Sequence, residues 1–157
     1  GNDIKLKGFN SDVIGFTQSI EPMLESYHKK ALVLGTGGAS KAISYGLQSL
    51  GLETVYVSRY QRPDTICYED ITPEVIKEYN VIVNCTPVGM FPKTEECPKL
   101  PYESMDEKNI LYDLIYNPDE TLFMTKGAER GASVKNGLEM LLLQAFASWE
   151  FWNGKEK

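Results

Sequence analysis

The sequence has few of the residues that metal sites and disulfide frameworks need. Its 157 residues include three cysteines and one histidine. Cys67, Cys85 and Cys97 are odd in number and share no C-x-x-C spacing, which argues against a disulfide framework and against a zinc site. Because so few thiols fit a reducing compartment, we expect a cytoplasmic protein that binds no metal. The histidine, His28, lies in a polar run and is predicted to be a solvated linker residue.

Long hydrophobic runs and an excess of positive charge are missing as well. The longest unbroken apolar stretches, such as 31–34 and 140–143, are much shorter than the ~20 residues of a membrane span. The net charge is −6, because 22 acidic residues outnumber 16 basic ones, and it repels nucleic acid and anionic lipid. We therefore expect neither a membrane nor a nucleic-acid partner. Hydrophobic residues at 42% and charged residues at 24% are ordinary for one soluble domain.

Short apolar runs alternate with helical patterns along the chain. The spacing of apolar residues predicts a helix from about 11 to 25, with Ser11 as its N-cap and Pro22 either kinking it or starting a second short turn. The other predicted helices begin near residues 38, 73, 120 and 137, and the predicted strands cover 31–34, 54–57, 65–68, 81–84, 110–115 and 131–134. This alternation is typical of an α/β fold, a Rossmann-like doubly wound parallel sheet with helices on both faces. The default ligand site of such a sheet is the crevice outside the carboxyl ends of its strands.

A glycine-rich segment lies between the first long strand and the helix that follows it. Gly35-Thr36-Gly37-Gly38-Ala39-Ser40 fits the spacing G-x-G-x-x-[G/A], with Ser40 as the third small residue. Glycine at 35 allows a tight turn, and glycine at 37 lets backbone N–H groups approach a pyrophosphate at the start of the helix. The segment therefore predicts a dinucleotide site; the alternative is a turn that only reverses the chain.

The end of the second strand is the next test of a dinucleotide site. In NAD-binding domains an acidic residue ~20 positions further on binds the ribose 2′-hydroxyl. Here that position is Ser58, followed by Arg59 and Arg62, while Glu53 stands at the other end of the strand. A guanidinium can pair with a 2′-phosphate, so the sequence favours NADP over NAD. For Arg59 the alternative is a solvated loop charge.

Five segments, taken together, resemble the shikimate dehydrogenase family. They are Gly8-Phe9-Asn10-Ser11-Asp12 with Gly15-Phe16; the glycine segment 35–40; Ser58-Arg59-Tyr60; Asn84-Cys85-Thr86-Pro87-Val88-Gly89-Met90; and Asp113-Leu114-Ile115-Tyr116-Asn117-Pro118 followed by residues 136–145. They occur in the family's order and span almost the whole chain. Ser-Arg-Tyr replaces the family's Asn-Arg-Thr, and the second basic residue, Arg62, comes one position early. Cys85 replaces a usual Thr or Ala and is expected to pack rather than to react.

The resemblance implies a two-domain enzyme that reduces 3-dehydroshikimate to shikimate with NADPH. In the family a catalytic lysine pairs with the aspartate of the first segment, which is Asp12 here. The lysine's own segment has no counterpart in this sequence, and Lys5 and Lys7 do not occupy its place. We therefore expect residues 1–25 to be the end of a substrate domain with its linking helix. Residues 26–157 are expected to be an NADP-binding domain whose last helix returns toward the substrate domain, and such a fragment is expected to be inactive alone.

The resemblance also implies roles for individual residues. Asp12 is catalytic, and Asn10, Tyr116 and Gln144 bind the substrate, shikimate or 3-dehydroshikimate. The expected cofactor-binding residues are Gly35, Thr36, Gly37, Gly38, Ala39, Ser40, Ser58, Arg59, Thr86, Gly137 and Met140.

The predicted last helix carries three of these residues. Gly137, Met140 and Gln144 are spaced so that they share one helix face, and glycine at 137 is expected to leave room for the nicotinamide. For Met140 the alternative is core packing. For Asp12 the alternative is a first-turn carboxylate that stabilises the helix dipole.

The last helix is also apolar on more than one face. Such a helix is normally buried on several sides, so it is predicted to pack on a further domain or, as a homo-oligomer, on a second copy of the chain. Two other functions stay open: a quinate or shikimate dehydrogenase that uses NAD, and a stand-alone nucleotide-binding module without catalysis. The absence of an acid at Ser58 disfavours the first.

Overall fold

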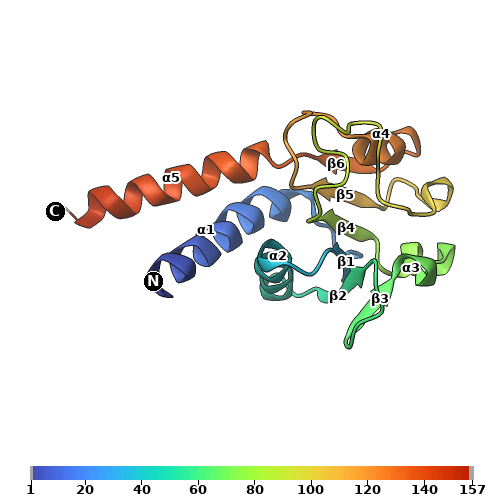
Figure 1. Cartoon of the computed structure of the whole chain (residues 1–157), viewed down its shortest axis with the longest axis horizontal. Coiled ribbons are helices and arrows are strands. Elements are labelled where there is room, and N and C mark those ends of the chain that lie inside the picture. The colour runs from blue at the N-terminus through green and yellow to red at the C-terminus, as the bar shows by residue number, and fades with distance from the viewer. Residues whose placement is uncertain (1, 156–157) are drawn as a thin grey trace.

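Six parallel strands form the centre of the molecule, in the order β3-β2-β1-β4-β5-β6 (Figure 1). The computed structural model describes residues 2–155 and places the side chains of residues 7–147 and 149. The strands are β1 (Lys30–Leu34), β2 (Glu53–Ser58), β3 (Thr65–Cys67), β4 (Val81–Asn84), β5 (Ile110–Asp113) and β6 (Ser133–Lys135). The helices are α1 (Asn2–Ile20), α2 (Gly38–Ser49), α3 (Pro73–Glu78), α4 (Leu122–Glu129) and α5 (Leu138–Lys155), with short 3-10 turns at Glu21–Met23, Tyr68–Asp70 and Tyr102–Ser104. The predicted doubly wound parallel sheet is confirmed.

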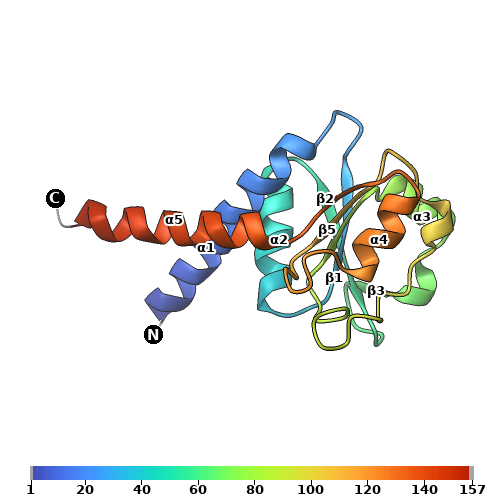
Figure 2. The same ribbon diagram turned by 90° about the horizontal axis from the view of Figure 1, so that it is seen from above.

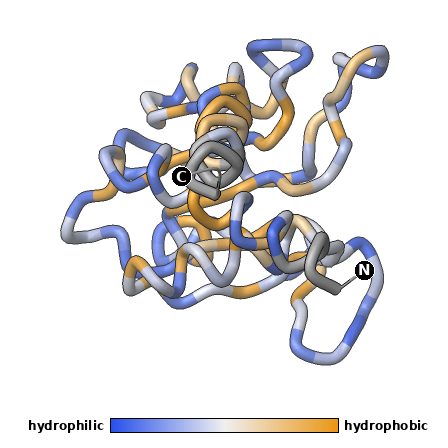
Figure 3. Tube along the Cα trace, turned by 90° about the vertical axis from the view of Figure 1, so that its left-hand side faces the viewer, coloured by the Kyte–Doolittle hydropathy of each residue, from blue (hydrophilic) through white to orange (hydrophobic). Residues whose placement is uncertain are grey.

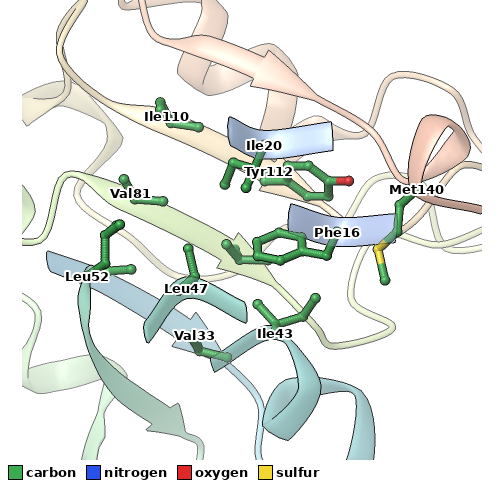
Figure 4. Packing of buried hydrophobic residues seen from close by; sticks show 12 residues of the cluster. Phe16, Ile20, Val33, Ile43, Leu47, Leu52, Val81, Ile110, Tyr112 and Met140 are labelled. Carbon is green, nitrogen blue, oxygen red and sulfur yellow. The ribbon is translucent and has the colours of Figure 1, made fainter. Parts of the chain in front are cut away.

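Helices cover both faces of the sheet, and alternate strand residues face each layer. On one face α1, α2 and α5 pack over Val33, Val81 and Tyr112, in the cluster drawn in Figure 4. On the other face α3 and α4 pack over Leu32 and Ile82. The central strands β1, β4 and β5 are buried along almost their whole length, which explains why they read as continuous apolar runs in the sequence.

Capping residues begin and end several helices. The hydroxyl of Thr72 accepts the N–H of Val75 at the start of α3, where Pro73 is the first helical residue. The hydroxyl of Thr121 accepts a backbone N–H in the first turn of α4 in the same way. Gly51 follows α2 with a φ of +92°, a conformation that favours glycine.

The first helix is longer than predicted at its amino end. Because α1 begins at Asn2, Ser11 lies inside it and is not an N-cap; its hydroxyl donates to the carbonyl oxygen of Lys7, 2.8 Å away. Asp12 is likewise not in the first turn, so the alternative that it stabilises the amino end of the helix dipole is wrong. Pro22 lies in the separate 3-10 turn that follows α1, one of the two predicted outcomes.

α1 and α5 lie side by side and extend together beyond the sheet (Figures 1 and 2). Gly15 permits this contact. A Cβ at this position would lie 2.7 Å from the carbonyl oxygen of Met140 and 2.8 Å from Cγ of Gln144. The local sequence does not indicate this role of Gly15, because the need for a small residue comes entirely from the other helix.

Apolar side chains of α5 remain exposed beyond this contact. Figure 3 shows hydrophobic colouring along the helix that leads to the C-terminus. The exposed residues are Leu138, Leu141, Leu142, Phe146 and Trp149. The prediction that this face packs on a further domain or on a second copy of the chain stays a prediction.

His28 is buried rather than solvated, which corrects the prediction made from the polar residues around it. Its Nδ1 accepts the backbone N–H of Glu25 at 2.8 Å. Since a carbonyl oxygen can only accept, Nε2 carries the proton and donates to Lys108 at 2.8 Å. The imidazole therefore joins the segment before β1 to the segment before β5 through backbone groups that the local sequence does not reveal.

Candidate functional site

The glycine segment forms the turn between β1 and α2, at the carboxyl edge of the sheet. Gly35 has a φ of +113°, and a Cβ there would lie 3.3 Å from Cγ2 of Thr86, so this position needs glycine for its conformation and is closely approached by a neighbour. At Gly37 and Gly38, in contrast, no heavy atom of the described residues lies within 4 Å of an added Cβ. Gly37 is the N-cap of α2, and it supplies no side-chain hydrogen bond to the first turn. The first N–H groups of α2 are therefore available to an anion.

Two other residues of the segment, Ser40 and Thr36, form hydrogen bonds at the turn. Ser40 is buried, and its hydroxyl donates to the carbonyl oxygen of Gly37 at 2.5 Å. Ala39 is exposed in the first turn of α2. The hydroxyl of Thr36 accepts a hydrogen bond from Nη1 of Arg62 at 3.4 Å. This bond connects the glycine turn to the loop that follows β2.

A pocket of about 410 Å³ opens beside this turn. Its lining residues are Thr36, Lys41, Tyr56, Arg62, Pro63, Asp64 and Thr65. Lys41 and Arg62 give the pocket two cationic groups next to the amino end of a helix, which suits a phosphate. Lys41 is not among the predicted site residues, although its place four residues after Gly37 puts it on the first turn of the predicted helix.

Arg59 does not line this pocket, so the structure brings Arg62 rather than Arg59 to the glycine turn. The guanidinium of Arg59 lies over the ring of Tyr60, 5.7 Å from its centroid. Ser58 is buried at the end of β2, where its hydroxyl accepts the N–H of Tyr60 at 3.2 Å. Glu53 begins β2, at the opposite edge of the sheet, as predicted.

Buried polar side chains stand at the carboxyl ends of β4 and β5. Asn84 and Asp113 are fully buried and hydrogen-bonded to each other at 3.1 Å. The hydroxyl of Thr86 donates to Oδ1 of Asn84 at 2.6 Å. Burial raises the pKa of Asp113 to about 6, and the three hydrogen bonds that its carboxylate accepts oppose that rise. Cys85 packs against the core as expected, and burial raises the pKa of its thiol.

α1 and α5 bring together two residues that the resemblance assigns to the active site. Nε2 of Gln144 donates a hydrogen bond to Oδ1 of Asp12. Burial raises the pKa of Asp12, and the hydrogen bond from Gln144 opposes that rise. Asn10 is exposed on α1, and Tyr116 is half-exposed in the loop after β5. Among the described side chains, neither of these hydrogen-bonds to the Asp12–Gln144 pair.

Gly137 and Met140 serve the chain's own packing. A Cβ at Gly137 would collide with the carbonyl oxygen of Leu114. Backbone thus fills the Cβ direction of this glycine, and the approach of a nicotinamide to it stays a prediction. Met140 is buried in the core cluster with Phe16, as its alternative interpretation states. Gly137 lies just before α5, whereas Met140 and Gln144 lie in it.

Neither a membrane span nor a metal cluster is found in the described part of the chain. None of its helices combines the length and the apolar character needed to cross a bilayer. No three His, Cys, Asp or Glu side chains among the described residues are grouped so that they could hold a metal ion.

A parallel sheet in this strand order, with a glycine turn between its first strand and helix, is the Rossmann-like class of α/β domain. Solved structures with this fold include shikimate dehydrogenases. The chorismate mutase/shikimate 5-dehydrogenase fusion protein of Clostridium acetobutylicum is 37% identical with a TM-score of 0.77, over 92% of this chain and 54% of that one. The shikimate 5-dehydrogenase of Thermus thermophilus, solved with NADP(H) and shikimate, is 29% identical with a TM-score of 0.77, over 92% and 56%.

Curated relatives agree with these structures. The NADP⁺ shikimate dehydrogenase of Caldanaerobacter subterraneus is 36% identical over 168 residues, which cover 96% of this chain and 59% of that enzyme. The chain spans about 60% of the length of the curated relatives it matches. No family model matches the chain. The resemblance predicted from the motifs is confirmed: the chain is similar to the carboxyl-terminal part of shikimate dehydrogenases.

Proposed function

We propose that this chain is the NADP-binding part of a shikimate dehydrogenase, an enzyme that interconverts 3-dehydroshikimate and shikimate by hydride transfer. The observation that carries the proposal is the open turn at Gly37 and Gly38 beside the pocket that holds Lys41 and Arg62. Relatives support it, since they are NADP⁺ enzymes and one was solved with NADP(H) and shikimate.

The turn and the pocket offer groups for both phosphate positions of the cofactor. The N–H groups at the start of α2, over residues 38–40, would bind the pyrophosphate at the positive end of the helix dipole. Lys41 and Arg62 would bind the 2′-phosphate that distinguishes NADP from NAD. Thr86 would border the turn from the neighbouring strand. NADPH, when bound, supplies the hydride; the roles predicted for Ser58 and Arg59 stay predictions.

The substrate side of the proposal rests on Asp12 and Gln144. Their hydrogen bond orients the carboxylate where α1 and α5 meet, and partial burial keeps it out of bulk water. The resemblance implies that Asp12 pairs with a lysine, so that a proton can reach the alkoxide oxygen of the reduced substrate. Since no lysine of this sequence matches that position, we propose that the chain binds the cofactor but does not turn over substrate alone. Asn10 and Tyr116 are the further candidates for substrate contacts.

Two other functions make different predictions. An NAD-dependent quinate or shikimate dehydrogenase needs a ribose-binding acid at the end of β2, where this chain has Ser58. Further along the chain the pocket is lined by Arg62 and by one acid, Asp64. A stand-alone nucleotide-binding module would bind NADP without the Asp12–Gln144 pair having a role. A cytoplasmic location and the division of the chain at residue 25 stay predictions under each of these functions.

A valine at position 37 tests the proposed function. Gly37→Val places a branched side chain in the open space before α2 and is expected to weaken NADP⁺ binding at least about tenfold, with stability changed by no more than about 1 kcal/mol. Gly8→Val is the matched control, because Gly8 is also open to solvent but lies on α1, outside the glycine turn. Calorimetric titration measures the NADP⁺ affinity of both variants. Binding by Gly37→Val that equals binding by the unaltered chain would contradict the proposal.

A further inference from the structure

Asp113 is the most enclosed charged side chain at the carboxyl edge of the sheet, and it accepts three hydrogen bonds. Its Oδ1 accepts Nδ2 of Asn84 at 3.1 Å and the backbone N–H of Ile115 at 3.0 Å. Its Oδ2 accepts the hydroxyl of Thr121 at 2.7 Å. The side chain has no solvent exposure, and the function proposed above gives it no role.

The contact with Asp113 decides which way the amide of Asn84 points. A carboxylate that faces three donors acts as an acceptor, so the NH₂ group of Asn84 must lie on its side. The same NH₂ group also donates to the carbonyl oxygen of Val88 at 3.4 Å. The amide oxygen of Asn84 is therefore turned toward Thr86, where it accepts the backbone N–H at 3.1 Å and the hydroxyl at 2.6 Å.

Thr86 in turn forms one wall of the glycine turn. Its hydroxyl accepts the N–H of Val88 at 3.2 Å, which closes a tight turn after β4. Its methyl carbon lies 3.3 Å from the position that a Cβ would take at Gly35. The N–H of Cys85 donates to the carbonyl oxygen of Leu34 at 2.9 Å, so the two segments are also joined through the backbone. If the Asn84 amide were rotated, its NH₂ group would face the backbone N–H and the hydroxyl of Thr86, which are both donors. Thr86 would then move away from the glycine turn.

We propose that Asp113 is a positioning residue of the nucleotide crevice, which orients Asn84 and thereby holds Thr86 against the glycine turn. This inference rests on the proposed NADP site, because it assigns Asp113 an effect on cofactor affinity. It does not make Asp113 a group that touches cofactor or substrate. A residue that only stabilised the sheet would need burial and satisfied hydrogen bonds, but not this particular order of donors and acceptors.

A double-mutant cycle tests the order of donors and acceptors directly. Asn84→Asp places two carboxylates against each other and is expected to weaken NADP⁺ binding about tenfold at pH 8. Asp113→Asn combined with Asn84→Asp restores a donor opposite an acceptor between the two side chains and leaves a carboxylate oxygen facing Thr86. The backbone N–H of Ile115 and the carbonyl oxygen of Val88 lose their partners in this variant, so the rescue is partial. We expect the double variant to bind NADP⁺ at least about threefold more tightly than Asn84→Asp.

Hydrogen exchange at the backbone amides of Thr86 and Val88 provides a readout that needs no cofactor. Both amides are expected to exchange at least about tenfold faster in Asn84→Asp and to recover in part in the double variant. Tyr112→Phe is the control for a general loss of stability, because it removes a buried hydrogen bond to Ser19 on the other face of the sheet. It is expected to change neither cofactor affinity nor the relative protection of the two amides.

The outcomes separate this inference from the proposed function. If the unaltered chain binds no NADP⁺, the proposed function fails, and the exchange rates still decide whether Asp113 orders the Thr86 segment. A double variant whose affinity and exchange are as poor as those of Asn84→Asp would overturn the inference. Should Asn84→Asp not fold, Asp113→Ala replaces it: faster exchange at the amides of Thr86 and Val88 with about three- to tenfold weaker binding supports the inference, and unchanged values overturn it.

Discussion

The molecule has two candidate binding regions, and they are built in different ways. The glycine turn between β1 and α2 is made by neighbouring residues of one short segment, and its two central glycines are open to solvent. The Asp12–Gln144 pair joins residues 132 positions apart, through a helix contact in which Gly15 has no spare room. Glycine at the first region leaves open space next to the backbone, and glycine at the second lets the chain approach itself.

This difference decides what a substitution does in each region. A larger side chain in the open turn should leave the fold intact and affect the ligand. A larger side chain at a close backbone contact should cost folding free energy before any ligand is added.

The strongest test of a close backbone contact is Gly137→Ala. The added methyl group would collide with the carbonyl oxygen of Leu114, so we expect a loss of at least about 3 kcal/mol of unfolding free energy. Gly38→Ala is the matched control, because the same methyl group meets no described atom there and should change stability by no more than about 1 kcal/mol. Urea denaturation measures both. Equal losses of unfolding free energy in the two variants would contradict the difference between open and filled glycine positions.

The carboxylates of Asp113 and Asp12 should make stability depend on pH to different extents. Burial raises the pKa of Asp113 from an ordinary 3.8 to about 6, so between these values the folded chain holds a proton that the unfolded chain has released. This contribution to stability is fully present below pH 4 and is lost as the pH rises through 6. Relative to Asp113→Asn, the unaltered chain should lose up to about 3 kcal/mol between pH 4 and pH 7.

The matching comparison for Asp12 has the same sign and a smaller size. Burial also raises the pKa of Asp12, but its carboxylate is only partly buried. Relative to Asp12→Asn, stability should therefore fall less over the same pH range than it does relative to Asp113→Asn. Denaturation at several pH values measures the stability of the unaltered chain relative to each Asn variant. If the unaltered chain instead lost stability on acidification, and both Asn variants removed that loss, the two pKa values would be lowered and not raised.

The helix contact itself is tested by Gly15→Ala. A Cβ at Gly15 would lie 2.7 Å from the carbonyl oxygen of Met140, so α1 and α5 must separate at a cost of about 1–3 kcal/mol. On the same helix, Gly8→Ala meets no described atom and should stabilise the chain by up to about 1 kcal/mol, because alanine favours helix. Thermal unfolding compares the two variants. Stability changes of opposite sign in the two variants support the contact, and changes of the same sign would count against it.

The smallest expected effect concerns the glycine turn and its pocket, and asks which arginine binds the 2′-phosphate. Arg62 lines the pocket with Lys41, whereas Arg59 lies over Tyr60. We expect Arg62→Ala to weaken NADPH binding about tenfold, or about 1.4 kcal/mol, and to leave NADH binding nearly unchanged. Arg59→Ala should have an effect of about threefold or less. A larger effect of Arg59→Ala would return the phosphate role to the residue that the sequence alone favours.

Much of the first region could be predicted from the sequence, because its determinants are local. The Gly35–Ser40 turn, the Thr72 cap and the buried strands depend on residue type, spacing and neighbours in the chain. The sequence also indicated the exposed helix face on α5, from its excess of apolar residues. Lys41 was within reach of the same reasoning, since helix geometry places it beside the turn.

The second region was predicted only through the family resemblance, because its determinants are tertiary. Nothing next to Gly15 or Gly137 in the sequence indicates the backbone atoms that lie against them. Ser11 has the right residue type for a helix start, but its hydroxyl bonds inside a longer helix. His28 has polar neighbours, yet its two ring nitrogens bond to backbone groups that include one from a loop 80 residues away.

The central claim is that the open glycine turn and the Lys41–Arg62 pocket form a site for NADP rather than NAD. A calorimetric titration of the chain with NADPH and, in parallel, with NADH at the same salt concentration tests it most directly. Binding of NADPH at least about tenfold tighter than that of NADH, by about 1.4 kcal/mol, is the predicted result. Equal affinity for the two cofactors, or binding of neither, would contradict it.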